Sequence, residues 1–416
     1  MIPQGYKQTE IGVIPEDWNC VRFGEKVKIY RGGSPRPIQN FITTSSNGVN
    51  WIKIGDVGEN DKYIHSTQEK IIPEGVSKSR EVHVGDFILS NSMSFGRPYI
   101  LDIDGCIHDG WLTIQDYKNT FATEYLYYLL SSDQVYQQYL SMAAGSSVKN
   151  LNKDKVSALN VIYPKIPEQK RIAEALSDVD SMISSLEKLI AKKKAVKQGA
   201  MQELLTGKKR MPGFTDEWEI KTLKEISHEI VDGPFGSDLK KEHYTTERQV
   251  RIIQLSNIGE SGWNDENTKY TTFAHAYELI RCIVQPQAVL IAKMMPAGRA
   301  ILCPNNEKGY ILGSDIVKLI PNDDIDRKYL IYATKSQFYL DQIADDTQGS
   351  TRSRTSVSKL RKTSILFPPK SEQTAIASIL SDMDNEIEAL EQKLEKTRQI
   401  KQGMMQQLLT GKIRLV

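Results

Sequence analysis

The feature that most constrains this chain is a long segment that occurs twice. Residues 163–211 align without a gap with residues 367–415, so each position of the first copy matches the position 204 residues later. Glu168-Gln169 matches Glu372-Gln373, and the sequence LLTGK occurs near the end of both copies. Solenoid repeats have periods of roughly 20–50 residues. A period this long instead indicates a domain-sized duplication and therefore a covalent pseudo-dimer.

The sequence before each copy is also repeated, but more loosely. Trp18 corresponds to Trp218, the segment 49–59 resembles 250–260, and Gly96-Arg97 corresponds to Gly298-Arg299. Because the helical copies are similar and the globules have diverged, we expect the helices to do one job twice and the globules to do related but different jobs. The predicted domains are globule 1–162, helix 163–207, globule 208–366 and helix 367–416.

Length and composition are those of an ordinary globular chain. The 416 residues suffice for two or three domains, and the shares of 39% hydrophobic and 25% charged residues are typical. The N-terminal sequence MIPQGYKQTEIG lacks the apolar stretch of a signal peptide, and no apolar run approaches the roughly 20 residues that span a membrane. Four scattered cysteines fit free thiols in a reducing compartment, so we expect a cytoplasmic protein without membrane contacts.

The repeated segments carry a heptad pattern of apolar residues, which is typical of a coiled coil. Pro167 and Pro369 lie where each helix should begin, and Gly207 and Gly411 lie where it should end. A helix of about 39 residues is roughly 58 Å long. The predicted seam of the helix pair comprises Leu176, Val179, Ile183, Leu186, Ile190, Leu204, Leu380, Met383, Ile387, Leu390, Leu394 and Leu408.

The simplest way to bury both seams is to pack one helix on the other. A pseudo-two-fold axis perpendicular to the helices would make them antiparallel. The alternative is that each helix lies on its own globule. Lys197 and Lys401 occupy matched seam positions, which indicates either a place where the helices separate or a place where an acidic group of a partner binds.

The globules are predicted to be mixed α/β, so the fold class is α+β: two pseudo-repeated α/β globules and two long helices that form an antiparallel coiled coil. Short β-branched runs such as WIKIGDV and VRIIQLS are separated by Gly, Asn and Ser turns. Each globule is expected to contain one helix, at 123–143 and 326–344. The tyrosines on these helices are expected in the core or at an interface. They are Tyr125, Tyr127, Tyr128, Tyr329 and Tyr332.

No catalytic or metal-binding constellation is expected. The chain lacks the G-x-x-x-x-G-K-[ST] phosphate loop and a Gly-rich cofactor fingerprint, and its six histidines lack metal-ligand spacing. Glu168-Gln169-Lys170 resembles the E-x-K of metal-dependent nucleases. In the second copy the lysine is replaced by Thr374, which argues against a nuclease.

Taken together, these motifs resemble the specificity (S) subunits of type I restriction–modification systems over the whole chain. The strongest element is EQxxIAxxLSDxD, which begins at Glu168 and again at Glu372 and leads into a helix that ends in QxLLTGKxR. Each globule also opens with a tryptophan segment followed by a Gly-rich turn, at 31–37 and 232–237. The two turns differ in sequence, as expected of globules that recognise different DNA.

The resemblance implies a non-catalytic, DNA-binding subunit. Each globule would be a target recognition domain for one half of a bipartite site in double-stranded DNA. The helices would set the gap and bind two methyltransferase (M) subunits, and restriction (R) subunits would use the same address. The chain itself would bind no cofactor, because S-adenosylmethionine, ATP and Mg belong to the partners. Half-sites about 34 Å apart lie within the reach of such helices, so inserting four residues between Leu205 and Gly207 should lengthen the gap or abolish activity.

The candidate DNA contacts are polar side chains in turns or near strand ends, where they could meet phosphates or base edges. For each one, an ordinary solvated side chain is the alternative. In the first globule they are Arg31, Ser34, Arg36, Lys53, Asn91, Ser94 and Arg97. In the second they are Gln254, Asn257, Lys293, Arg299, Arg352 and Arg354.

Three other readings remain open at this point. The near-neutral net charge of +2 fits a coiled-coil adaptor with two peptide- or glycan-binding heads and no DNA affinity. A fused restriction enzyme with its own catalytic centre would need the missing phosphate loop. A DNA reader in another methyltransferase-dependent defence system would differ only in its partners.

Overall fold

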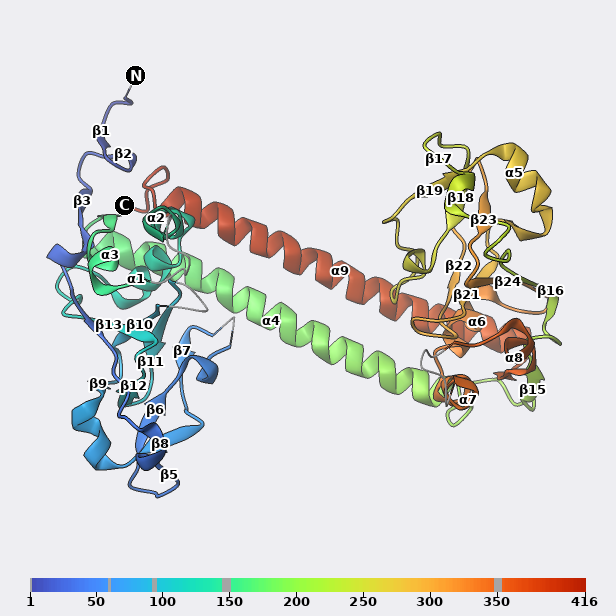
Figure 1. Cartoon of the computed structure of the whole chain (residues 1–416), viewed down its shortest axis with the longest axis horizontal. Coiled ribbons are helices and arrows are strands. Elements are labelled where there is room, and N and C mark those ends of the chain that lie inside the picture. Colours follow the sequence, from blue (N-terminus) through green and yellow to red (C-terminus); the bar gives the residue numbers. More distant parts are fainter. Residues whose placement is uncertain (1, 59–60, 92–95, 144–150, 348–353) are drawn as a thin grey trace. The chain divides into compact units, whose positions relative to one another are not determined.

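The computed structural model describes the chain except residues 1, 59–60, 92–95, 144–150 and 348–353 (Figure 1). The chain forms two compact units, each made of one globule and parts of both long helices. The first unit contains Met1–Glu187 and Gln392–Val416, and the second contains Lys188–Glu391. The first globule is the part that precedes the first long helix, and the second globule lies between the two long helices.

The first globule is built around two five-stranded sheets. One has the order β4-β13-β10-β11-β7, namely Lys28–Arg31, Trp111–Gln115, Phe87–Ser90, Pro98–Leu101 and Tyr63–Ile64. The other has the order β5-β8-β6-β12-β9, namely Ile42–Thr43, Glu69–Ile71, Val49–Ile52, Gly105–Ile107 and Arg80–Val82. Two strand pairs complete it: β1 (Tyr6–Thr9) with β2 (Gly12–Pro15), and β3 (Asn19–Arg22) with β14 (Asn160–Tyr163). Strand β13 follows β12 directly in the chain, so the turn between them connects the two five-stranded sheets.

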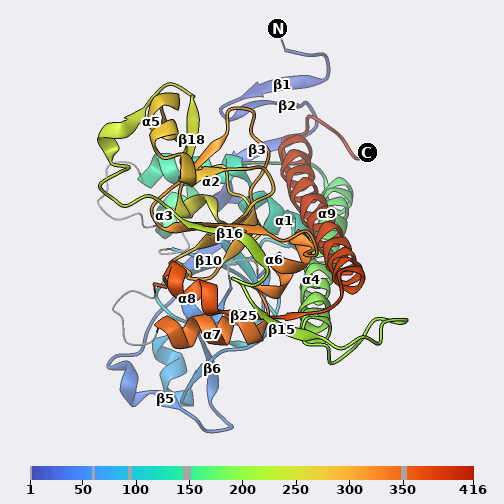
Figure 2. The ribbon, with the colours of Figure 1, turned by 90° about the vertical axis from the view of Figure 1, so that its right-hand side faces the viewer.

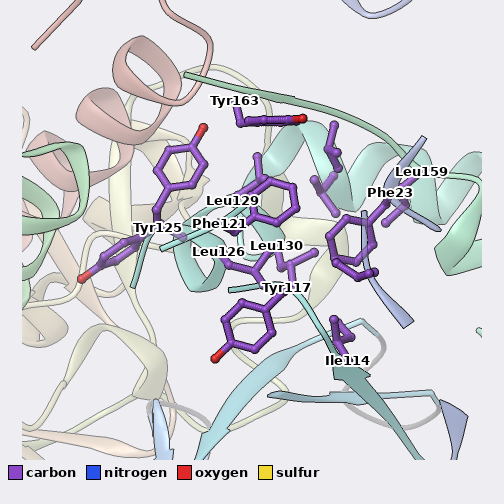
Figure 3. Close-up of a cluster of buried hydrophobic side chains, with 14 of the residues drawn as sticks. Phe23, Ile114, Tyr117, Phe121, Tyr125, Leu126, Leu129, Leu130, Leu159 and Tyr163 are labelled. Atoms are coloured by element: carbon purple, nitrogen blue, oxygen red, sulfur yellow. The ribbon is translucent and has the colours of Figure 1, made fainter. Parts of the chain in front are cut away.

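The helices of the first globule cover one hydrophobic core. They are α1 (Thr123–Leu130), α2 (Asp133–Ala143) and α3 (Lys153–Ser157). Tyr125 and Leu126 of α1 are fully buried beside Phe121 and Tyr163 (Figure 3). Tyr128 is also fully buried, whereas Tyr127 is partly buried. The tyrosines of α1 therefore belong to the core, as expected.

The second globule repeats this plan with a four-stranded and a five-stranded sheet. The first has the order β16-β24-β21-β22, namely Ser227–Asp232, Ile316–Pro321, Val289–Ala292 and Ala300–Leu302. The second has the order β17-β19-β18-β23-β20, namely Tyr244–Thr245, Lys269–Thr271, Val250–Ile253, Tyr310–Leu312 and Ile283–Val284. A strand pair joins β15 (Glu219–Thr222) to β25 (Ser364–Phe367).

The helices of the second globule are α5 (Phe273–Glu278), α6 (Arg327–Ala333), α7 (Gln337–Thr347) and α8 (Val357–Lys362). Helix α7 packs beside β25 (Figure 2). Tyr329 and Tyr332 of α6 are buried, as expected of core residues.

The prediction of one helix in each globule is wrong, because each predicted segment is two helices. Ser132 breaks the first: its hydroxyl donates to the carbonyl of Leu129 at 2.7 Å and accepts from the Val135 N–H at 3.3 Å. Ser336 does the same in the second segment, with Ala333 and Tyr339. A serine that satisfies a free N–H at a helix start favours a new helix there. The short helices α3, α5 and α8 were also missed.

The long helices have the expected length and ends. Helix α4 spans Ile166–Leu204 and α9 spans Lys370–Leu408, 39 residues each. Pro167 lies in the first turn of α4, and Pro369 immediately precedes α9. Gly207 and Gly411 follow the helices with φ of +69° and +72°, a backbone conformation that glycine adopts without strain.

Segments of α4 and α9 run antiparallel within each unit. In the first unit, the Lys401 ammonium lies 2.6 Å from Asp180, and the Arg398 guanidinium lies 2.7 Å from Glu187. In the second unit, Lys193 contacts Glu386 at 2.6 Å and Lys194 contacts Glu391 at 2.7 Å. Residue numbers fall along one helix as they rise along the other. The predicted fold class, two repeated mixed globules with an antiparallel helix pair, is therefore confirmed.

The predicted seam residues are all buried or half-buried. The buried members are Leu176, Leu186, Ile190, Leu204, Leu380, Ile387 and Leu408, and the half-buried members are Val179, Ile183, Met383, Leu390 and Leu394. The ends of the seam join the globule cores: Leu176 and Leu408 pack in the first, Leu204 and Leu380 in the second. Packing on the partner helix and packing on a globule, which were weighed as alternatives, therefore occur together. No helix in the described part of the chain is long and apolar enough to cross a membrane.

Candidate nucleic-acid interface

The two globules hold their polar turns on the same backbone frame. In the first, the N–H of Gly32 donates to the carbonyl of Trp111, and that of Asn91 donates to the carbonyl of Gly110, at 2.9 and 3.0 Å. In the second, Gly233 donates to Ile316 at 2.9 Å and Lys293 donates to Asp315 at 2.8 Å. Leu151 closes the first frame on the Asn91 carbonyl, and Thr355 closes the second on the Lys293 carbonyl.

A glycine is required at the same place in both frames. A Cβ atom on Gly32 would lie 2.1 Å from the carbonyl oxygen of His108, and one on Gly233 would lie 2.0 Å from that of Gly313. No side chain fits at such distances, because the obstacle is backbone. The turn after β4 and the turn after β16 are thus fixed against the turn that precedes β13 or β24.

In the first globule this frame gathers polar side chains around Asp109. The Ser34 hydroxyl donates to its Oδ1 at 2.7 Å, and an Arg36 nitrogen lies 3.5 Å from its Oδ2. Arg31 and Asn91 donate to the Asp109 carbonyl at 3.3 and 2.9 Å. We call Arg31, Ser34, Arg36, Asn91, His108 and Asp109 the first loop cluster.

The charge state of Asp109 follows from these neighbours. Burial raises the pKa of Asp109, but the Ser34 hydroxyl, His108 and Arg36 together lower it by more. The pKa of Asp109 therefore lies below its ordinary value. The Nδ1 atom of His108 accepts from the Gly110 N–H at 2.8 Å, and its Nε2 atom lies 3.2 Å from Asp109. Asp109 is therefore an ionised hub that orients donors around it.

The remaining candidates of the first globule lie apart from this hub. The Lys53 ammonium pairs with Glu69 at 2.8 Å, and the Arg97 guanidinium lies over the Tyr99 ring, 5.8 Å from its centre. Ser94 lies outside the described residues. Asp109 itself was missed, although the Asp-Gly pair after a strand is a turn signal that could have drawn attention to it.

In the second globule the frame carries different side chains. The buried Lys293 ammonium pairs with Asp232, and Arg354 pairs with Asp315 at 2.7 Å. We call Asp232, Lys293, Asp315 and Arg354 the second loop cluster. Lys293 and Arg354 were predicted, but the two aspartates that hold them were missed.

The other candidates of the second globule differ in accessibility. Asn257 is fully buried, and its side chain accepts from the Gln254 N–H and donates to the carbonyls of Asn264 and Glu266. These bonds stabilise a loop and leave its amide no exposed surface. Gln254 is half-buried, and Arg299 donates to the Ile258 carbonyl at 3.3 Å. Arg352 lies outside the described residues.

The equivalent positions of the two clusters therefore differ in charge. Arg31 corresponds to Asp232 and Asn91 corresponds to Lys293, because the strand registers and backbone bonds coincide. Both clusters present hydrogen-bond donors and acceptors, which suits recognition of polar groups. In the described ranges, no group of three or more His, Cys, Asp or Glu side chains is placed to hold a metal ion.

The Glu-Gln motif at the start of each long helix attaches a globule to that helix. Gln169 accepts from the Ala122 N–H and donates to the carbonyls of Thr120 and Pro164, at 2.8 to 2.9 Å. Gln373 accepts from the Asp326 N–H and donates to the Pro368 carbonyl. Each glutamine thus fixes the start of the globule's helix α1 or α6 to the first turn of a long helix.

The glutamate of the motif pairs with an arginine that follows the other long helix. Arg414 binds Glu168 at 2.7 and 2.8 Å and Asp17 at 2.9 Å, over the Trp18 ring; we call this the first clamp. Arg210 binds Glu372 at 2.9 and 2.8 Å, over the Trp218 ring; we call this the second clamp. Burial raises the pKa of Glu372, but the hydrogen bonds from Arg210 and Trp218 lower it by more, so this pKa lies below its ordinary value. The carboxylates of Glu168 and Glu372 are buried and paired, so they are structural.

The seam lysines are explained by the opposite helix of the same chain. Lys197 pairs with Asp384 and lies over the Tyr332 ring, and Lys401 pairs with Asp180 and lies over the Tyr128 ring. Each tyrosine hydroxyl donates to the second oxygen of the same aspartate at 2.7 Å. The acidic group at each seam lysine therefore comes from within the chain, and it also bonds a globule helix.

Comparisons with known proteins agree with this architecture. The chain matches the family described as "Type I restriction modification DNA specificity domain" twice, over residues 15–198 and 215–399. It is 23% identical over 421 residues to the type I restriction enzyme MjaVIII specificity subunit of Methanocaldococcus jannaschii, covering 97% of this chain and 94% of that protein. It is 20% identical over 431 residues to the MjaIX specificity subunit of the same organism, covering 99% and 96%.

Solved structures share the fold. A chain from a study of complex assembly and conformational transition of the type I R-M system superposes with a TM-score of 0.65 at 19% identity, covering 96% of this chain and 99% of that chain. The HsdS subunit from Thermoanaerobacter tengcongensis gives 0.54 at 19% identity, covering 99% and 100%. The two family matches together cover most of the chain, so this chain belongs to the family of type I restriction–modification specificity subunits.

Proposed function

We propose that each globule reads one half of a bipartite DNA site with its loop cluster. The observation that carries this proposal is the pair of clusters: one backbone frame in both globules, with different donors, acceptors and charges on it. A shared frame supports a shared mode of approach to DNA. Different side chains on that frame support different base sequences, because base edges are distinguished by their pattern of donors and acceptors.

The long helices then set the gap and bind two methyltransferase subunits. Support comes from the clamps, which use the same glutamine, glutamate and arginine contacts in both units and so hold each globule firmly on its helix segments. The repetition of one helical surface fits two copies of one partner. Restriction subunits would use the same address. In this proposal, S-adenosylmethionine, ATP and Mg act on the partner subunits, and this chain supplies recognition without covalent chemistry.

The test is the pattern of DNA methylation that the chain directs. The chain is expressed with its methyltransferase subunit in a host without adenine methylation, and native DNA is sequenced by a single-molecule method that detects modified adenine. We expect a split motif with two defined halves and a constant gap, absent without this chain. An assembled complex with an active methyltransferase that produced no such motif would overturn the proposal.

The gap can be tested separately from the half-sites. Inserting four residues between Leu205 and Gly207 should lengthen the gap or abolish activity, without changing the bases of either half. Arg210 of the second clamp lies three residues after Gly207, so a loss of activity is expected if the insertion breaks its contact with Glu372. An active variant with an unchanged gap would show that the helices do not set it.

A further inference from the structure

One aromatic side chain beside the second loop cluster has no counterpart in the first. Phe235 lies in the turn after β16 and is 75% exposed. Single exposed apolar residues are common on protein surfaces, so exposure alone indicates nothing. The setting of Phe235 is what distinguishes it: it follows Asp232 of the cluster by three residues.

The turn presents Phe235 from a fixed backbone. Gly233 is packed against the Gly313 carbonyl, and Pro234 is buried. Beyond the aromatic residue, the Asp238 N–H donates to the Phe235 carbonyl at 2.9 Å and closes the turn. Asp232 is held at the other end by Lys293. The ring is thus projected outward from a backbone that is bonded on both sides.

The first globule uses the same turn position differently. Counted from the glycine of the frame, Phe235 corresponds to Ser34, because Gly233 corresponds to Gly32. The Ser34 hydroxyl bonds Asp109 at 2.7 Å and so belongs to the polar network. A phenylalanine makes no such bond. At this position one globule offers a hydrogen-bonding group and the other offers an apolar surface.

We propose that Phe235 is a specificity-determining residue that contacts the 5-methyl group of a thymine in the major groove of the second half-site. This inference rests on the proposed function and deepens it. Asp232 and Asp315 each pair with a cation of the cluster, so the cluster is not the set of free cations that a narrow minor groove attracts, and this argues for the major groove. In the major groove the thymine methyl is the apolar feature of the base edges, and phenylalanine is among the side chains that contact it.

The experiment replaces thymine by deoxyuridine, which removes only the methyl group. The chain, assembled with its methyltransferase subunit, is titrated with duplexes that carry the motif found by methylation sequencing, with each thymine of the second half replaced in turn. We expect one replacement to weaken binding by the wild type about fourfold, the effect of one buried methyl-sized group. The Phe235→Ser complex should bind the substituted and unsubstituted duplexes equally.

Three controls make the result specific. Deoxyuridine in the first half-site should affect the wild type and Phe235→Ser equally, because that half is read by the other globule. Tyr277→Ala removes another aromatic side chain of the same globule, 73% exposed on α5, and should keep the wild-type response. Thermal unfolding of each variant checks that the fold is retained, as expected for exposed positions.

The outcomes separate this inference from the proposed function. A split motif whose second half contains no thymine on either strand would overturn the role of Phe235 alone. So would equal binding of all deoxyuridine duplexes by the wild type, or an undiminished response in Phe235→Ser. Failure to find any split motif would instead overturn the bipartite reading on which the inference rests.

Discussion

The clamps and the loop clusters were duplicated together, yet only the clamps kept their chemistry. Glu168 and Glu372 both receive two hydrogen bonds from an arginine that lies over a tryptophan ring. In the loop clusters, Arg31 and Asn91 of the first globule occupy the positions that Asp232 and Lys293 occupy in the second. The contacts that attach each globule to the helices are the same in both units. The side chains of the turns can differ between the globules, because the frame that holds the turns is made of backbone groups and glycine.

The two clamps also differ in one respect that can be measured. Arg414 bridges two carboxylates, Glu168 and Asp17, whereas Arg210 binds one carboxylate and the carbonyl of Asp216. Trp218 donates to Glu372 at 2.9 Å, whereas the buried Nε1 of Trp18 has no hydrogen-bond partner among the described residues. The second clamp thus keeps a donor on its glutamate when the arginine is removed, and the first does not.

The largest expected effect is therefore the loss of Arg414. Arg414→Met leaves Glu168 and Asp17 uncompensated, and removing one partner of a buried ion pair costs about 3 kcal/mol. Arg210→Met should cost less, because Trp218 still bonds Glu372. Urea unfolding followed by tryptophan fluorescence measures both, with the exposed pair Lys28–Asp116 as control, where Lys28→Ala should leave the free energy of unfolding nearly unchanged. Equal losses in the two clamps would refute the asymmetry.

The next effect tests whether the loop frames are equivalent. Gly32→Ala and Gly233→Ala each place a methyl group about 2 Å from a backbone oxygen, so the turn must move. Overpacking of this kind costs about 2 kcal/mol. Each change should reduce the base specificity only at the half-site of its own globule in the methylation motif. Gly55→Ala, where nothing lies within 4 Å, is the matched control. A variant that blurred both halves would contradict independent readers.

A smaller effect is expected where each globule helix meets the helix pair. Tyr128→Phe and Tyr332→Phe remove the hydroxyl that donates to Asp180 or Asp384 at 2.7 Å, while the ring stays. Each should lower the free energy of unfolding by about 1.5 kcal/mol, the low end for a hydrogen bond to a charged group, because these bonds are only partly buried. Chemical denaturation compares them with Tyr136→Phe, an exposed tyrosine of α2. A neutral result at either core tyrosine would show that its seam lysine alone holds the aspartate.

The smallest effect is the response to mild acid. The pKa values of Asp17 and Glu372 are lowered in the folded chain, for Asp17 chiefly by Arg414, so these groups release protons more readily than in the unfolded chain. Their contribution is fully present above their unfolded pKa values, near 4, and is lost as the pH falls through the lower folded values. Between pH 7 and pH 5 neither clamp should therefore contribute to a fall in the free energy of unfolding. Below pH 4, the free energy of unfolding of Arg210→Met should decline less steeply with falling pH than that of the wild type. A clamp-dependent loss above pH 5 would contradict the assignment.

Much of the fold could be predicted because the repeated segments are long and periodic. The heptads of α4 and α9, the prolines at their starts and the glycines after their ends are local signals that act within a few residues. The strands were found less well: the run WIKIGDV supplies only the end of β6, and its second half becomes a short 3₁₀ helix at Ile54–Asp56. The backbone N–H of Lys53 bonds the Asp56 side chain there, a local choice that alternation of residue types does not reveal.

The candidate site was predicted in part because glycine-rich turns and isolated cations are visible in one dimension. Ser34, Arg36, Arg31 and Asn91 were named without knowledge that Asp109 draws them together, since 75 residues separate Ser34 from that aspartate. Asn257 appeared equally polar in the sequence, but its amide bonds three backbone groups in the interior. The carboxylates that orient these cations were missed because phosphates attract cations, so an isolated aspartate in a turn does not by itself indicate a DNA contact.

By itself, the sequence determined the duplication, the two long helices with their ends, the mixed globules and the family, because each of these rests on spacing and on motifs within short stretches of chain. Only the tertiary structure decided the partners: that the arginine after one long helix closes on the glutamate at the start of the other, that the seam lysines find aspartates on the opposite helix, and that one frame carries Asn91 in the first globule and Lys293 in the second. These contacts join residues far apart in the chain, and strand register and antiparallel helix packing bring them together.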